Sequence, residues 1–205
     1  MVEKINWFGH ASFKITGEKI IYIDPWKITE EEKADIILIS HSHYDHFSLK
    51  DIKKITTRET DILITPDCQS KLRDVDGKVT LIEPGKKYNI KNTLIETTPS
   101  YNLNKKFHPK ENDWVGFIIN LNQSRIFYAG DTDNIPEIKN IKVDIALLPI
   151  SGTYVMDPKE AADLANSMKP KIAIPYHYGD IVGTEQDALK FKKLAQIPVE
   201  ILKKQ

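Results

Sequence analysis

The sequence has almost no cysteine, no long apolar run and no excess charge of either sign. Its single thiol, Cys68, excludes an internal disulfide and a zinc site built from several thiolates. Its apolar runs stay well short of the ~18 residues that a membrane-spanning helix needs. The 29 basic and 29 acidic side chains cancel, so the overall charge gives no case for nucleic-acid binding.

The length of 205 residues is enough for one well-buried core. We therefore expect a single domain over residues 1–205, or two closely packed halves. The segment Met1–His10 lacks the pattern of a signal peptide, which makes the cytoplasm the expected location. The sequence leaves the oligomeric state open.

Short β-branched or aromatic runs, divided by turn residues, predict a chain that begins with strands and continues as alternating strands and helices. The predicted strands are Val2–Phe8, Ala11–Thr16, Lys19–Asp24, Ala34–Ser40, Asp61–Thr65, Lys78–Glu83, Thr93–Thr98, Trp114–Leu121, Ser124–Ala129, Val143–Leu148, Lys171–Pro175 and Pro198–Leu202. The predicted helices are Ser48–Ile55, a short one from Asp67, Asp157–Met168 and Thr184–Leu194. This order favours an α/β fold with mixed sheets and outer helices.

The most informative segment is His41-Ser42-His43-Tyr44-Asp45-His46, directly after a predicted buried strand. Imidazole nitrogen and carboxylate oxygen are the usual ligands of zinc and similar divalent ions. The first two histidines of the segment can face one metal ion, and its last two residues can face a second. Solvated surface histidines would explain the segment less well, because it holds half of the chain's six histidines.

Two further strands end in residues that can bind a metal. Asp131 follows the predicted strand ending at Ala129, and His177 follows the strand ending at Pro175. Each alone is more typical of a turn or a cap. Together with the histidine-rich segment they form a pattern, because ligands on strand ends are held rigidly.

The motifs His41-Ser42-His43-Tyr44-Asp45-His46, Ala129-Gly130-Asp131-Thr132 and His177 resemble the metallo-β-lactamase superfamily of metallohydrolases. The stretches Trp7–Phe13 and Ile23-Asp24-Pro25 are similar to the branch that contains ascorbate-phosphate lactonases and N-acyl phosphatidylethanolamine phospholipases. The resemblance covers nearly the whole chain. It implies a four-layer αβ/βα sandwich of two mixed sheets between outer helices, with a dinuclear metal site at one edge.

The resemblance also implies which residues bind each ion. His41 and His43 would bind the first metal ion, and Asp131 would bridge the two. The second ion would take Asp45, His46 and His177. Zinc suits these ligands, and manganese or iron(II) are alternatives.

One ligand departs from the family pattern. The third histidine for the first ion is usually found just after the strand that is here Thr93–Pro99, but the following residues are Ser100-Tyr101-Asn102. His108 lies a few residues further on, and the loop could fold it back to the metal. Otherwise the first ion is weakly held, or water and Asn102 complete its coordination.

The function expected from this site is metal-dependent hydrolysis of a small ester, lactone or phosphodiester by a hydroxide that two metal ions activate. Asp45 would orient or deprotonate the nucleophile, and Tyr178, Tyr101 or His10 would stabilise developing oxyanion charge. A purely structural role of His10 in its turn is an equally supported alternative. The alternatives are a non-catalytic metal-binding or sensing module and a nuclease, although the chain has no room for the domain that RNA-cleaving members insert.

The sequence says little about the substrate. The loop 100–113 carries Lys105, Lys106 and Lys110, which would recognise a phosphate or carboxylate group, or would simply be a solvated basic loop. We therefore expect a small-molecule substrate, with an anionic group as one option.

Overall fold

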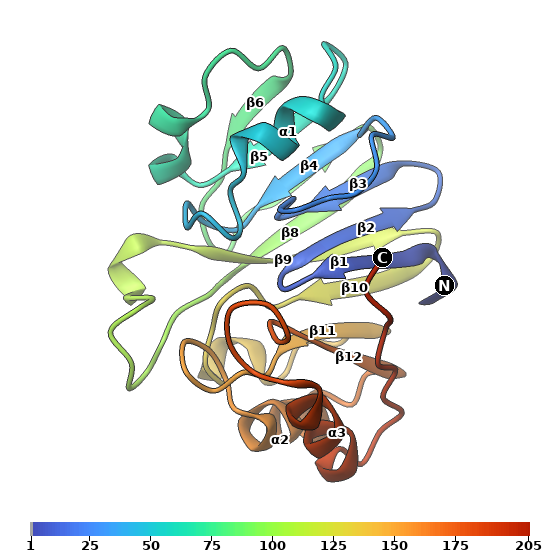
Figure 1. The fold of residues 1–205 in the computed structure, drawn as a ribbon, viewed down its shortest axis with the longest axis vertical. Coiled ribbons are helices and arrows are strands. Elements are labelled where there is room, and N and C mark those ends of the chain that lie inside the picture. The colour runs from blue at the N-terminus through green and yellow to red at the C-terminus, as the bar shows by residue number, and fades with distance from the viewer. Residues whose placement is uncertain (1) are drawn as a thin grey trace. The chain divides into compact units, whose positions relative to one another are not determined.

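Two six-stranded sheets organise the chain in the computed structural model, which describes residues 2–205 (Figure 1). One unit consists of the chain up to Glu83 together with Lys203–Gln205, and the second unit consists of Pro84–Leu202. In each unit an antiparallel part of the sheet continues into a parallel part.

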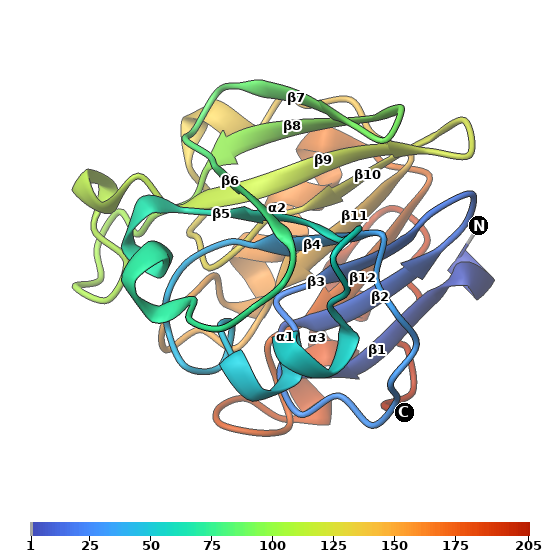
Figure 2. The same ribbon diagram turned by 90° about the horizontal axis from the view of Figure 1, so that it is seen from above.

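The first unit holds a sheet with the strand order β1-β2-β3-β4-β5-β6 (Figure 2). Its first three strands pair antiparallel, and each later pair is parallel. The strands are β1 (Ile5–Gly9), β2 (Ser12–Thr16), β3 (Ile20–Ile23), β4 (Ile36–Ile39), β5 (Asp61–Ile64) and β6 (Lys78–Leu81), with helix α1 at Leu49–Ile55 and a 3-10 helix at Pro66–Lys71.

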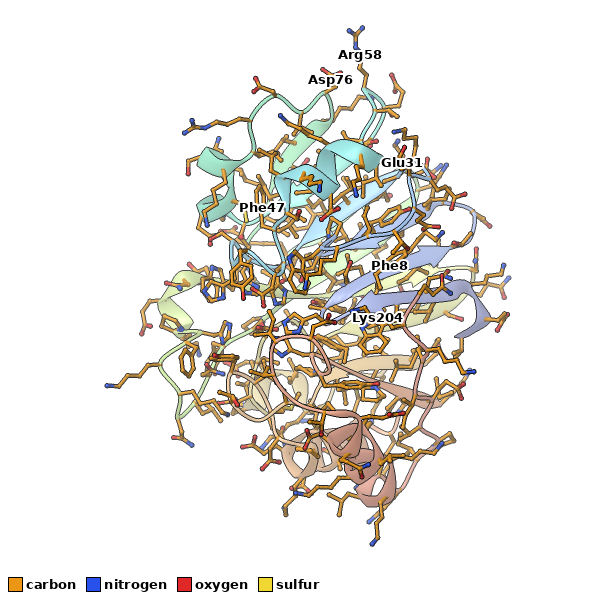
Figure 3. All side chains as sticks on the ribbon, in the orientation of Figure 1. Phe8, Glu31, Phe47, Arg58, Asp76 and Lys204 are labelled. Carbon is orange, nitrogen blue, oxygen red and sulfur yellow. The ribbon has the colours of Figure 1, made fainter. Side chains whose placement is uncertain are left out.

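Helix α1 packs on this sheet through Ile52 and Ile55, which share a buried apolar cluster with Ile37 of β4 and Ile62 of β5. Phe8 and Phe47, both labelled in Figure 3, belong to the same cluster. Ser48 caps the helix by accepting a hydrogen bond from the backbone N–H of Asp51. This packing holds β4 rigidly, and β4 leads directly into the histidine-rich segment.

The second unit holds a sheet with the order β12-β11-β10-β9-β8-β7, antiparallel from β7 to β10 and parallel from β10 to β12. Helix α2 begins with a capping box between Asp157 and Glu160, and α2 and α3 pack together beside β11 and β12 (Figure 1). The elements are β7 (Lys87–Ile90), β8 (Thr93–Pro99), β9 (Val115–Leu121), β10 (Ser124–Tyr128), β11 (Ile145–Pro149), α2 (Pro158–Met168), β12 (Ile172–Tyr176) and α3 (Glu185–Leu194), with 3-10 helices at Lys110–Asn112 and Pro136–Ile138.

The predicted α/β class with two mixed sheets and flanking helices is confirmed. Three local predictions were wrong or incomplete. A 3-10 helix at Val2–Lys4 replaces the start of the predicted strand Val2–Phe8. Within residues 2–205, the predicted strand Pro198–Leu202 makes only a single bridge, from Val199 to Ala173. The edge strand β7 escaped prediction because its residues are only half-buried or exposed, so they show no continuous apolar run.

The division into one domain or two stays a prediction of the sequence. Among the helices of residues 2–205, none combines the length and the hydropathy needed to cross a membrane.

Candidate metal centre

The histidine-rich segment leaves the first sheet at the end of β4 and forms a tight turn. The carbonyl of His43 accepts hydrogen bonds from the N–H groups of His46 (3.0 Å) and Phe47 (2.8 Å). This turn places Tyr44 and Asp45 at its tip. His41 and His46 are buried, whereas His43 and Asp45 are half-buried.

Asp24, which follows β3, is the fully buried acceptor that organises this segment. Its carboxylate accepts from the backbone N–H of Ser40 (2.7 Å) and the Ser40 hydroxyl (2.5 Å), and lies 2.7 Å from Nδ1 of His46. A carboxylate at Nδ1 fixes the tautomer of the ring and makes Nε2 the coordinating nitrogen. Asp24 therefore orients His46 directly and His41 through Ser40, whose Oγ lies 2.9 Å from Nδ1 of His41.

His41 and His43 lie close enough to bind the same ion. Nε2 of His41 is 3.0 Å from Nδ1 of His43. Zinc–nitrogen distances of about 2.0–2.1 Å in a tetrahedral site put neighbouring ligand atoms ~3.3 Å apart. The two imidazoles thus have nearly the spacing that one zinc ion requires.

Asp45 contacts a histidine from a different strand connection. Nε2 of His10 lies 2.8 Å from Oδ2 of Asp45, and Nε2 of His46 lies 3.8 Å from the same oxygen. His10 is fully buried in the turn between β1 and β2. His10 therefore contacts the carboxylate of a candidate metal ligand.

In the second unit, the ends of β10 and β12 carry the next two ligand candidates. Nε2 of His177 lies 3.0 Å from Oδ2 of Asp131, and Ser151 Oγ lies 3.0 Å from Nδ1 of His177. Both candidates are almost fully buried. The parallel pairing β10-β11-β12 brings these strand ends to one edge of the sheet.

His108 joins this group although 22 positions separate it from Asp131 in the sequence. Its Nε2 lies 3.2 Å from Oδ2 of Asp131, and the side chain is 2% exposed. Asn102 Oδ1 and the carbonyl of Tyr154 each lie 3.1 Å from Nδ1 of His108. The loop thus folds His108 back onto Asp131, and Asn102 contacts its other ring nitrogen.

Three of these residues have a left-handed backbone conformation, which residues other than glycine rarely adopt. The angle φ is +48° at His10, +44° at Asp24 and +63° at His177. Left-handed residues other than glycine cost energy and gather at functional sites. The same conformation occurs in ordinary turns of this chain, such as Asn122-Gln123, so here it shows only that the backbone turns sharply after β1, β3 and β12.

The donor atoms fit divalent metal ions. In the second unit, two imidazole nitrogens lie within 3.2 Å of one carboxylate oxygen. In the first unit, Nε2 of His41 and Nδ1 of His43 lie 3.0 Å apart, and Nε2 of His46 lies 3.8 Å from Oδ2 of Asp45. Nitrogen and oxygen donors in this number and spacing suit zinc, manganese or iron.

The lysines of the loop 100–113 mostly bind acidic side chains of their own unit. Lys105 lies 2.5 Å from Oδ1 of Asp133, and Lys110 lies 2.9 Å from Oε1 of Glu137. Tyr101, a candidate for oxyanion stabilisation, donates its hydroxyl to Glu137 at 3.0 Å. These contacts favour a structural role for Lys105 and Lys110 over recognition of an anionic substrate.

Tyr178 follows His177 and is 4% exposed. Burial raises the pKa of Tyr178 to about 12, so its hydroxyl is protonated at neutral pH. It can therefore donate a hydrogen bond but cannot act as a base there.

Sequence reasoning missed the residues that orient the ligands. Asp24, Ser40 and Ser151 each contact a candidate histidine from a different element. The signal for Asp24 was present, because an acid directly after an apolar strand is the same feature that identified Asp131.

Comparison with known proteins agrees with this geometry. Residues 4–177 match the family model described as "Beta-lactamase superfamily domain". A metal-dependent hydrolase of Thermoplasma acidophilum is 34% identical, and the match covers 94% of this chain and 90% of that protein. A metal-dependent hydrolase of Thermococcus onnurineus is 31% identical, and the match covers 97% of this chain and 95% of that protein. A crystallised protein of Parabacteroides distasonis, described as a metal-dependent hydrolase, superposes with a TM-score of 0.86 at 34% identity, over 98% of this chain and 93% of that one.

Proposed function

Because the chain belongs to the beta-lactamase superfamily and is a metal-dependent hydrolase, we propose that it hydrolyses a small ester, lactone or phosphodiester at a dinuclear centre. The observation that carries the proposal is the approach of His108 and His177 to one oxygen of Asp131, at 3.2 and 3.0 Å. A buried carboxylate oxygen shared by two imidazole nitrogens is the arrangement expected around a bridging ligand.

The proposed ligands come from both units. His41, His43 and His108 would hold the first ion, and Asp131 would bridge to the second. The second ion would be held by Asp45, His46 and His177. We propose zinc as the metal, in keeping with the imidazole-rich donor set.

Two bound divalent ions would lower the pKa of water toward neutrality and polarise the scissile carbonyl or phosphoryl oxygen. Asp45 accepts the proton of the attacking water and passes it to the leaving oxygen. His10 holds the Asp45 carboxylate at 2.8 Å, so the proton-accepting oxygen stays in place. Tyr178 donates its hydroxyl to negative charge that develops on the substrate.

Hydrolysis of an ester forms one bond, breaks one bond and transfers one proton. The water oxygen forms a bond to the acyl carbon, the acyl–oxygen bond breaks, and the alcohol leaves with the proton that Asp45 carried. The same residues would serve a lactone, in which acid and alcohol remain in one molecule. The small-molecule substrate and a cytoplasmic location belong to this proposal.

Elemental analysis of the purified protein, paired with a panel of lactones, thioesters and phosphodiesters, tests the proposal. Two metal ions per chain and turnover of at least one class are expected. Full metal occupancy without turnover of any class would instead support a non-catalytic metal-binding module on the same scaffold. Turnover restricted to phosphodiesters in RNA would favour a nuclease.

A further inference from the structure

An aromatic side chain projects into solvent from the middle of the histidine-rich segment. Tyr44 stands between His43 and Asp45, and it is 67% exposed. It lies at the tip of the turn that the two hydrogen bonds to the His43 carbonyl close. An exposed ring on so rigid a turn is preorganised for contact with another molecule, since ordering it costs little further entropy.

Trp26 forms the second half of an aromatic pair with Tyr44. The two ring centroids lie 6.2 Å apart at an interplanar angle of 75°, an edge-to-face arrangement. Trp26 also lies 5.5 Å from the ring of His10, which contacts Asp45. The pair therefore stands beside the residue that we assign to proton transfer.

The segment around Trp26 is fixed from the backbone. The N–H of Trp26 donates to Ser12 Oγ at 3.2 Å, and the N–H of Lys27 donates to Asp51 Oδ2 at 2.9 Å. The ammonium of Lys27 sits over the Trp26 ring, 3.9 Å from its centroid. Lys27 thus covers one face of the Trp26 ring. Of the two rings, Tyr44 exposes the larger aromatic surface.

We propose that Trp26 and Tyr44 select substrates whose acyl group carries an apolar ring, which packs against the exposed face of Tyr44. The inference rests on the proposed hydrolase function and adds a substrate class to it. An aromatic face prefers a flat apolar partner, because such a partner displaces water from both surfaces and gains offset or edge contacts.

The contacts of the loop lysines support this class over a phosphorylated one. Lys105 and Lys110 are engaged by Asp133 and Glu137 in their own unit. Recognition of a phosphate by Lys105 or Lys110 would compete with these ion pairs. The exposed ring of Tyr44 needs no such rearrangement to bind an apolar group.

Two esters with the same leaving group test the proposal. Hydrolysis of ethyl phenylacetate and ethyl acetate by the zinc-loaded protein is followed by acid release at constant pH, and the ratio of their kcat/KM values is compared. The variant Tyr44→Ala is expected to lower this ratio about tenfold, which corresponds to ~1.4 kcal/mol. Tyr44→Phe keeps the ring and should keep the ratio.

The matched control is Leu189→Ala, which removes a 47%-exposed apolar side chain from α3 and should leave the ratio unchanged. Zinc content is measured for each variant, so that metal loss is separated from lost recognition. An unchanged ratio in Tyr44→Ala, or an equal loss in Tyr44→Phe, would overturn the proposal while leaving the hydrolase function standing.

Direct binding separates the two proposals if the protein hydrolyses neither ester. Calorimetric titration of the zinc-loaded protein with phenylacetate and with acetate compares two carboxylates that differ only in the ring. Tighter binding of phenylacetate that Tyr44→Ala abolishes would support the aromatic site and count against ester hydrolysis. Equal affinity for the two carboxylates in the unaltered protein would overturn the aromatic site.

Discussion

The hydroxyl of Tyr176 donates a 2.6 Å hydrogen bond to the carbonyl of Gly130, and this bond ties together two strand ends that carry proposed ligands. Asp131 follows Gly130, and His177 follows Tyr176. The ring of Tyr176 stacks on Tyr128 of β10 at 4.9 Å. The bond and the stack together fix the distance between β10 and β12 where the ligands leave the sheet.

Removal of this hydroxyl should weaken the metal site more than the fold. We predict that Tyr176→Phe, which keeps the stacked ring, lowers the free energy of unfolding by about 1 kcal/mol because a buried carbonyl loses its donor. The zinc affinity, measured by chelator competition, should fall as well. A stability loss with unchanged zinc affinity would restrict the role of the bond to the fold.

Gly130 should tolerate no side chain. Its φ is +70°, and a Cβ would lie 2.6 Å from Ser100 Oγ and 2.8 Å from the carbonyl of Val115. We predict that Gly130→Ala destabilises the protein by roughly 2–4 kcal/mol in urea unfolding, because overpacking adds to backbone strain.

Gly85 provides the matched control for this substitution. Its φ is +76°, but a Cβ there would meet no atom within 4 Å. Gly85→Ala should therefore cost only the strain of the left-handed backbone, about 1 kcal/mol. Equal losses in the two variants would show that the crowding around Gly130 is relieved by small movements.

Asp24 should control metal affinity without touching the metal. The carboxylate accepts from Ser40 and His46, and an amide in its place can present a donor to Nδ1 of His46. We predict that Asp24→Asn lowers zinc affinity about 10- to 100-fold, as changes to such orienting partners do. Asp51→Asn, at another buried aspartate of the same unit, should leave zinc affinity near that of the unaltered protein.

His108 and Asp131 should differ in how much metal their loss releases. We predict that His108→Ala retains about one ion per chain, whereas Asp131→Ala loses nearly all metal together with activity, because a bridging ligand serves both ions. Elemental analysis after gel filtration gives the counts. Asn104→Ala, at an exposed position of the same loop, is the control. Full metal content in the His108→Ala variant would show that His108 is not a metal ligand.

Cys68 should be inert at neutral pH. Burial raises the pKa of this thiol to about 12, and the reactive species is the thiolate. We predict that native protein at pH 8 reacts slowly with a thiol reagent and that urea accelerates the reaction. Cys68→Ala should retain zinc content and activity, since no thiolate belongs to the proposed ligand set.

The same shift makes stability depend on alkaline pH. The pKa of Cys68 is higher in the folded than in the unfolded chain, so its contribution is complete below pH 9. It is then lost between pH 9 and about 12, as the unfolded chain releases the proton first. Urea unfolding across this range should show a shallower decline for Cys68→Ala than for the unaltered protein. If the free energy of unfolding fell equally steeply with pH in both proteins, the raised pKa of Cys68 would be contradicted.

The sequence by itself determined the fold class and the ligand candidates on strand ends. Apolar runs such as Ile36–Ile39 and Ile145–Pro149 predict buried strands, because a strand has apolar side chains on both faces when both faces of its sheet are covered. The segment His41–His46 and the isolated Asp131 and His177 follow such strands directly. Local patterns therefore sufficed wherever a ligand lies next to its supporting element.

Only the tertiary structure decided which distant residues meet. The loop 100–113 has no periodicity that brings His108 to Asp131; hydrogen bonds of Asn102 and the carbonyl of Tyr154 do so. Asp24 likewise reaches His46 because β3 and β4 are parallel neighbours, a pairing that the sequence does not specify. Contacts across a long loop depend on the packing of the whole unit, and that packing leaves no signal in local spacing.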